Sequence, residues 1–80
     1  MTLNEAIITR IYEICKDKNI TLNKLSTICG ITQSTLNNIV SKKSLKPTVS
    51  TIKKICDGMD MQLSDFFDTD YFKALEQEIR

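Results

Sequence analysis

Four uncharged polar side chains lie close together in the middle of this 80-residue chain, at offsets that suit one face of a helix. They are Gln33, Ser34, Asn37 and Asn38. An amide side chain donates and accepts hydrogen bonds at once, so Gln and Asn can pair bidentately with N6 and N7 of adenine in the DNA major groove. These residues favour recognition by hydrogen bonding, although surface amides without any such role are also common.

Groups that carry catalysis are scarce. The chain has no histidine, so acid-base chemistry would fall to lysines or carboxylates, and the acidic C-terminal third is typical of helix caps and a solvated face. The spacing of Cys15, Cys29 and Cys56 matches no zinc-binding or CxxC pattern, and we expect reduced, buried thiols. A redox sensor at Cys29 is the weaker alternative, because reactive thiols need an exposed, electropositive setting. We predict no enzyme activity, no cofactor and no metal.

Charge is divided along the chain although the net charge is only +1. Residues 16–54 hold eight lysines and one aspartate, a net +7, whereas residues 57–80 hold seven acidic and two basic residues, a net −5. This asymmetry is typical of an electropositive surface that attracts a polyanion, with an acidic region elsewhere. A solvated lysine surface explains the charge pattern equally well.

Apolar residues recur with helical spacing through most of the chain. The first stripe consists of Leu3, Ile7, Ile11 and Ile14. Its offsets are typical of an amphipathic helix. Similar stripes predict helices over 3–18, 22–29, 33–40, 49–60 and 62–67, followed by a last helical segment from Asp70. A helix over 33–40 would bury Leu36 and Ile39 and leave the four polar residues on its outer side.

Capping signals fix where these helices begin and end. Thr21, Thr32 and Thr48 are suited to accept hydrogen bonds from free amides in the next turn. Gly30 can adopt the left-handed backbone conformation that ends a helix. The chain is therefore expected to be all-α, with a tight turn between the second and third helices.

These two helices and their turn carry a recognisable pattern of apolar, small and turn residues. The positions are Leu25, Ser26, Cys29, Gly30, Ile31, Leu36 and Ile39. The pattern resembles the helix-turn-helix of Cro-like, lambda-repressor-like regulators, the xenobiotic-response-element class. The resemblance continues through Pro47 and the pattern Met61, Leu63, Phe66, so it covers about residues 3–68.

The resemblance implies a lambda-repressor-like five-helix DNA-binding domain over residues 1–68 and a C-terminal helical segment over 69–80. It also implies that the helix over 33–40 lies in the major groove, where Gln33, Ser34 and Asn38 would contact bases and Asn37 a base or a phosphate. Candidate phosphate contacts are Thr21, Asn23, Thr32, Lys42, Lys43 and Lys46. For Thr21 and Thr32 we expect the cap role, with phosphate contact an additional one, and each lysine could equally be a solvated side chain.

Three positions depart from the family pattern. Leu22 stands where a polar phosphate contact is usual, so we expect that contact to be absent. Cys15 and Val40 occupy the positions at which many relatives pair an arginine with a glutamate, an apolar replacement that removes the cost of desolvating two charges. Gln62 replaces the usual serine cap of the fifth helix.

We therefore predict a cytoplasmic, sequence-specific regulator that binds double-stranded DNA, a repressor by family resemblance. No secretory signal, membrane span or small-molecule site is evident. The alternative is a protein-interaction module, such as the antitoxin-like partner of another protein. The last segment would then be the binding element, through Tyr71, Phe72, Leu75 and Ile79. These residues could instead pack on the domain or form a homodimer. We prefer these two possibilities to a foreign partner, because symmetric homodimers are the commonest oligomers.

Overall fold

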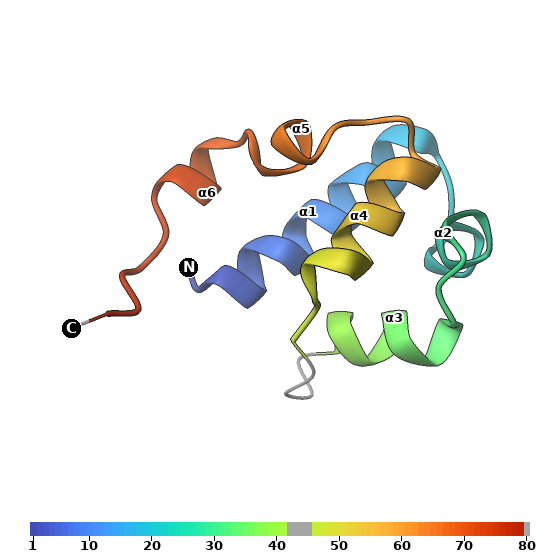
Figure 1. The fold of residues 1–80 in the computed structure, drawn as a ribbon, viewed down its shortest axis with the longest axis horizontal. Coiled ribbons are helices and arrows are strands. Elements are labelled where there is room, and N and C mark those ends of the chain that lie inside the picture. The colour runs from blue at the N-terminus through green and yellow to red at the C-terminus, as the bar shows by residue number, and fades with distance from the viewer. Residues whose placement is uncertain (42–45, 80) are drawn as a thin grey trace.

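The computed structural model describes residues 1–41 and 46–79 (Figure 1). Within these ranges the chain forms α1 (Leu3–Lys18), α2 (Leu22–Cys29), α3 (Gln33–Val40), α4 (Val49–Gly58), α5 (Leu63–Phe67) and α6 (Asp70–Lys73), with no strand. The all-α prediction is confirmed, and the first three helices have the expected bounds. None of the helices in the described part of the chain has the length and apolarity to cross a bilayer.

Threonine side chains begin five of these helices. In each case the hydroxyl accepts a hydrogen bond from the backbone amide three residues later, which satisfies one of the free donors in the first turn. The caps are Thr2, Thr21, Thr32, Thr48 and Thr69. The caps predicted at Thr21, Thr32 and Thr48 are confirmed.

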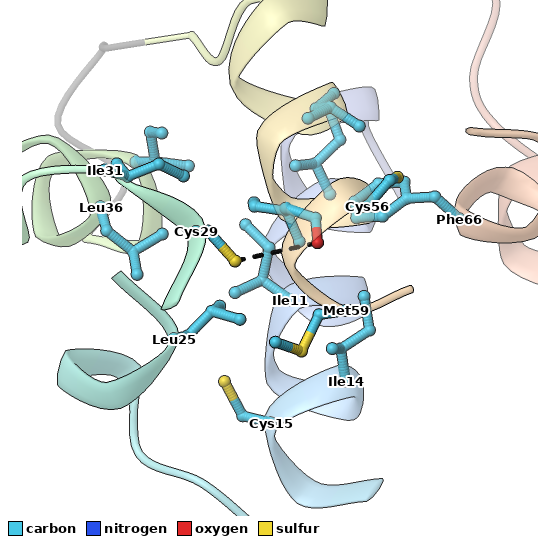
Figure 2. Close-up of a cluster of buried hydrophobic side chains, with 14 residues drawn as sticks. Ile11, Ile14, Cys15, Leu25, Cys29, Ile31, Leu36, Cys56, Met59 and Phe66 are labelled. Carbon is cyan, nitrogen blue, oxygen red and sulfur yellow. Dashed lines mark hydrogen bonds between the residues drawn. The ribbon is translucent and has the colours of Figure 1, made fainter. Parts of the chain in front are cut away.

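A single apolar cluster joins the helices. Figure 2 shows Ile11 and Ile14 of α1 facing Leu25 and Cys29 of α2. The helices α3 and α4 and Phe66 of α5 complete the cluster. The cluster draws on the buried side chains of five helices, so it fixes the position of each helix against the others.

Gly58 brings α4 very close to α2. A Cβ atom at Gly58 would lie 2.4 Å from the Cys29 sulfur and 3.1 Å from its Cα. The Cys29 thiol donates toward the Ile55 carbonyl at 3.8 Å, as the dashed line in Figure 2 shows. Only glycine allows this approach, because any side chain at Gly58 would occupy the space of the sulfur.

The expected end of α4 was wrong. The helix ends at Gly58 and not at residue 60, because Asp60 takes a left-handed φ of 54° and the Met61 amide turns back to donate to the Cys56 carbonyl at 2.9 Å. Val49, the first residue of α4, is 71% exposed. It lies in the first turn, and contact with the core begins one turn later, at Ile52.

The C-terminal segment is helical over a shorter stretch than the expected 69–80. It contains only α6, and residues 74–79 are not helical. In a continuing helix the Glu76 amide would donate to Phe72, but it donates to the Met1 carbonyl at 3.3 Å. Ile79 is 82% exposed, so no apolar contact supports a longer helix there.

Candidate nucleic-acid interface

The turn between α2 and α3 is set by Gly30. Its backbone is left-handed, with φ 68° and ψ 32°, and both its amide and that of Ile31 donate to the Ser26 carbonyl. This arrangement satisfies the free carbonyl at the end of α2 and reverses the chain within three residues. Ile31 is buried directly after the turn and Thr32 then caps α3. The turn therefore fixes where α3 starts relative to α2.

The orientation of α3 follows from its buried side. Leu36 and Ile39 are 1% and 3% exposed, and Val40 is half-buried against the same cluster. Figure 1 shows α3 along one edge of the molecule, away from α5 and α6. Because the apolar side of α3 faces the core, its other side faces solvent.

That outer side carries the four predicted base-contact residues, Gln33, Ser34, Asn37 and Asn38. All four are exposed. None of their side chains forms a hydrogen bond with another residue of the described ranges, 1–41 and 46–79. The hydroxyls of Thr32 and Thr35, by contrast, bond to each other at 2.8 Å. The structure thus brings together one face of exposed amide and hydroxyl groups whose hydrogen-bonding capacity is available.

Thr21, Asn23 and Thr32 are exposed near the starts of α2 and α3. The Thr21 hydroxyl accepts from the Lys24 amide, which leaves its proton available to an incoming oxygen. The Thr32 hydroxyl accepts from the Thr35 amide and also donates to Thr35, so its proton is already used. The two caps, which look alike in the sequence, therefore differ in whether the hydroxyl proton is available. Leu22 packs against the core.

Of the three predicted lysines, the structure describes Lys46. Lys42 and Lys43 lie outside the described residues. Lys46 is exposed and lines a cavity of about 390 Å³ together with Glu76 and Glu78, so it lies beside acidic groups. Lys24 is exposed in the first turn of α2 and was not among the predicted contacts, although it follows Asn23 directly.

The three thiols are buried and unbonded to one another, as expected. Burial raises the pKa of Cys15, Cys29 and Cys56 above its usual value, and for Cys29 the other two thiols add to the effect. A raised pKa disfavours the reactive thiolate. The redox-sensor alternative therefore lacks its exposed thiol. No group of three or more metal-ligating side chains occurs among the described residues.

Arg10 of α1 holds α5 in place. Its Nε donates to the Phe66 carbonyl at 2.7 Å and its Nη2 to the Asp65 carbonyl at 3.0 Å, at the end of that short helix. The guanidinium carbon lies 5.9 Å from the centre of the Phe66 ring. This role could not be predicted from the sequence, because no local signal links residues 56 apart.

The last segment divides into a packed part and an exposed part. Phe72 packs on Phe67, with ring centres 5.0 Å apart, and the Tyr71 hydroxyl donates to Glu13 of α1. Burial, followed by the hydrogen bond with Glu13, raises the pKa of Tyr71 to about 12. Leu75 is half-buried and Ile79 is exposed. Of the four residues predicted for packing or dimerisation, Tyr71 and Phe72 therefore contact the rest of this chain.

Comparison with known proteins gives consistent matches. Residues 10–70 match the family of Cro/C1-type HTH DNA-binding domains. A relative from Bacillus subtilis (strain 168), the SPbeta prophage-derived uncharacterized HTH-type transcriptional regulator YopS, is 31% identical over 58 residues, which are 72% of this chain and 78% of that protein. The crystal structure of the prophage Lp1 protein 11 is similar with a TM-score of 0.81 and 32% identity, over 90% of this chain and 95% of that one.

Proposed function

This chain belongs to the family of Cro/C1-type HTH DNA-binding domains, and from that premise we propose that it is a cytoplasmic repressor that recognises specific double-stranded DNA. It would act by occupying promoter DNA, without catalysis. The observation that carries the proposal is the exposed, unbonded polar face of α3, held outward by the burial of Leu36 and Ile39.

The dimensions of α3 suit the major groove. An α-helix with its side chains is about 10 to 12 Å in diameter. The groove is about 12 Å wide and admits one helix. Gln33, Ser34 and Asn38 would then contact base edges, and Asn37 a base or a phosphate. The exposed starts of α2 and α3, with Thr21, Asn23 and Thr32, would position the domain on the phosphates.

Lys42, Lys43 and Lys46 follow α3 in the sequence and would add phosphate contacts. Each phosphate neutralised releases counterions, so the affinity should fall linearly with salt on a double-logarithmic plot, by a slope of roughly 0.9 per contact. Fluorescence anisotropy of labelled duplexes at several salt concentrations measures this slope. A slope near zero, or no binding to any duplex at low salt, would contradict the proposal.

Gln33→Ala tests whether α3 reads bases. Loss of one bidentate contact should cost about 1 to 3 kcal/mol of binding free energy and relax the preference at one base pair. Selection from randomised duplexes, run in parallel on the natural chain and the variant, measures both effects. Ser64→Ala, an exposed position on α5, serves as the matched control. An unchanged base preference in the Gln33 variant would remove that residue from the reading face.

The exposed end of the chain favours a second function, binding to another protein or to a second copy. Ile79 is 82% exposed and Leu75 is only half-buried. We prefer the homodimer, for which DNA half-sites should lie about 34 Å apart or a multiple of that distance. Light scattering after size exclusion of the full chain and of Ile79→Asp tests this. A monomer in both cases, with selected sites that lack an inverted repeat, would count against the dimer.

A further inference from the structure

We infer that the base pairs contacted by α3 are A·T pairs, so that each half-site recognised by this chain has an A·T core. The inference rests on the proposed function, because it names the class of DNA sequence that the same face of α3 would bind. Its basis is the chemistry of the groups on that face and of those missing from it.

The amide groups of Gln33, Asn37 and Asn38 match adenine and mismatch guanine. Adenine offers one acceptor, N7, and one donor, the N6 amino group, in the major groove, whereas guanine offers two acceptors, N7 and O6. An amide that donates to N7 of adenine can accept from N6 with its oxygen. Against guanine the same oxygen would face O6, and two acceptors would be left without a proton between them.

The side chain that most often reads guanine is missing from α3. Arginine and lysine are the commonest partners of guanine O6 and N7, and α3 contains neither; the arginines of this chain are Arg10 and Arg80. The Arg10 side chain is only 16% exposed, and its donors are held by the Phe66 and Asp65 carbonyls. Arg80 lies at the other end of the sequence from α3 and outside the described residues. Residues 33–40 contain no charged side chain at all.

The reading groups are ready to bind, because no hydrogen bond within the described part of the chain has to break. The nearby hydroxyls of Thr32 and Thr35 are bonded to each other and accept one further bond from the Thr35 amide. The Thr32 proton is therefore used in the bond to Thr35, and the one proton left, that of the Thr35 hydroxyl, belongs to a half-buried side chain. The exposed groups for base reading are the three amides and Ser34, whose hydroxyl accepts from or donates to nearly any base.

The size of the A·T core follows from helix geometry. Gln33 lies one turn from Asn37, and Ser34 one turn from Asn38, so the four side chains form two short rows along α3. The rows extend over about 7.5 Å, at 1.5 Å per residue. Since successive base pairs are about 3.4 Å apart, the face covers roughly two to three base pairs. We expect an A·T core of that length in each half-site.

The test begins with selection of sites from randomised duplexes by the full chain. Each core A·T pair of the selected site is then replaced by G·C and, separately, by inosine·cytosine. Inosine presents the major-groove pattern of guanine but lacks its minor-groove amino group. Both replacements should weaken binding by roughly 5- to 100-fold per contacted pair. The same replacements outside the core should change affinity less than threefold.

The outcomes separate this inference from the function on which it rests. No binding to any duplex at low salt overturns the proposed function. Tight binding to selected sites with a G·C core leaves that function intact and overturns the inference. Inosine·cytosine pairs bound as tightly as A·T would also overturn it, because the preference would then come from the minor groove or from DNA shape.

Gln33→Arg supplies a matched variant with a guanine reader on the same scaffold. Its two donors should move the preference at one core pair from A·T to G·C, while the other core pairs stay A·T. A variant that folds and binds with an unchanged preference would show that position 33 faces no base. That result would also overturn the inference, since Gln33 lies in the first turn of α3.

Discussion

The helix-turn-helix and the C-terminal end of the chain are held by different kinds of contact. Between α2 and α4 the backbone at Gly58 lies against the side chain of Cys29, with no space for one more carbon atom. At the C-terminal end a helix of four residues is attached through Phe72 and through a hydrogen bond from Tyr71. Beyond it, Glu76 contacts Met1 in an exposed ion pair.

This difference matches the precision that each region needs. A helix that reads base edges must hold its side chains to within a fraction of an ångström, and close packing against a rigid core provides that. Beyond α6 the C-terminal contacts are exposed polar pairs between Glu76 and Met1, which add little stability. The end of the chain can therefore detach at small cost, whereas α3 cannot move without exposing Leu36 and Ile39.

Leu36→Ala should have the largest effect on stability, because it removes the side chain that anchors α3. Leu36 is 1% exposed, and such truncations cost about 2 to 5 kcal/mol. In a domain of this size that is a large share of the free energy of unfolding. Urea denaturation followed by circular dichroism measures it. Val49→Ala, at a position 71% exposed, is the matched control and should change stability by less than about 0.5 kcal/mol.

Gly58→Ala should destabilise the domain by about 2 kcal/mol, because the new Cβ overlaps the Cys29 sulfur. The higher helix propensity of alanine offsets part of that cost. The double variant Cys29→Ala/Gly58→Ala tests the cause, since removal of the sulfur opens space for the new carbon. Denaturation of both single variants and the double variant forms a cycle. If the losses of stability in the two single variants add up to the loss in the double variant, the two positions do not clash with each other.

Gly30→Ala should cost about 1 kcal/mol through the backbone alone. A Cβ at Gly30 meets nothing within 4 Å, but its φ of 68° is strained for an L residue. Asparagine tolerates this conformation better, so Gly30→Asn should lose less stability than Gly30→Ala. Thermal denaturation of the two variants shows which is less stable. A lower stability of Gly30→Asn would mean that a lack of space, as at Gly58, excludes side chains from this turn, and not the backbone conformation.

Local signals explain why so much of the helix-turn-helix could be predicted from sequence. A threonine cap, a glycine stop and an apolar stripe are each readable within a few residues, and they gave the bounds of α1, α2 and α3. The outward face of α3 followed from the positions of Leu36 and Ile39. Whether its four polar residues contact DNA stays a prediction. The contact between Gly58 and Cys29, by contrast, could not be inferred from either residue alone.

The C-terminal end was harder to predict because its contacts join distant positions. Arg10 reaches the Phe66 carbonyl across 56 residues and Tyr71 reaches Glu13 across 58. The Glu76 amide pairs with Met1 at the opposite end of the chain. An apolar spacing that continues to Ile79 suggested a longer helix. Spacing does not say whether a surface exists for those side chains to cover, and Ile79 is 82% exposed in the described part of the chain.

Tyr71→Phe should have the smallest effect, since it removes one partly exposed hydrogen bond and keeps the ring. We expect a loss of about 0.5 to 1.5 kcal/mol and unchanged affinity for DNA. The contribution of Tyr71 to stability also depends on pH, because the folded-state pKa of Tyr71 is raised from 10.0 to about 12. A group whose pKa is higher in the folded state stabilises the fold fully at a pH below its unfolded-state pKa. That stabilisation is lost as the pH rises through its folded-state pKa.

The difference in stability between the natural chain and Tyr71→Phe should therefore be constant below about pH 9 and shrink between pH 10 and 12. Urea denaturation at a series of pH values measures it. Tyr12, which is 48% exposed, provides the control, and Tyr12→Phe should show no such narrowing. A loss in Tyr71→Phe as large as that in Leu36→Ala would contradict the contrast between the two regions, because the C-terminal end would then be part of the same rigid unit as α3.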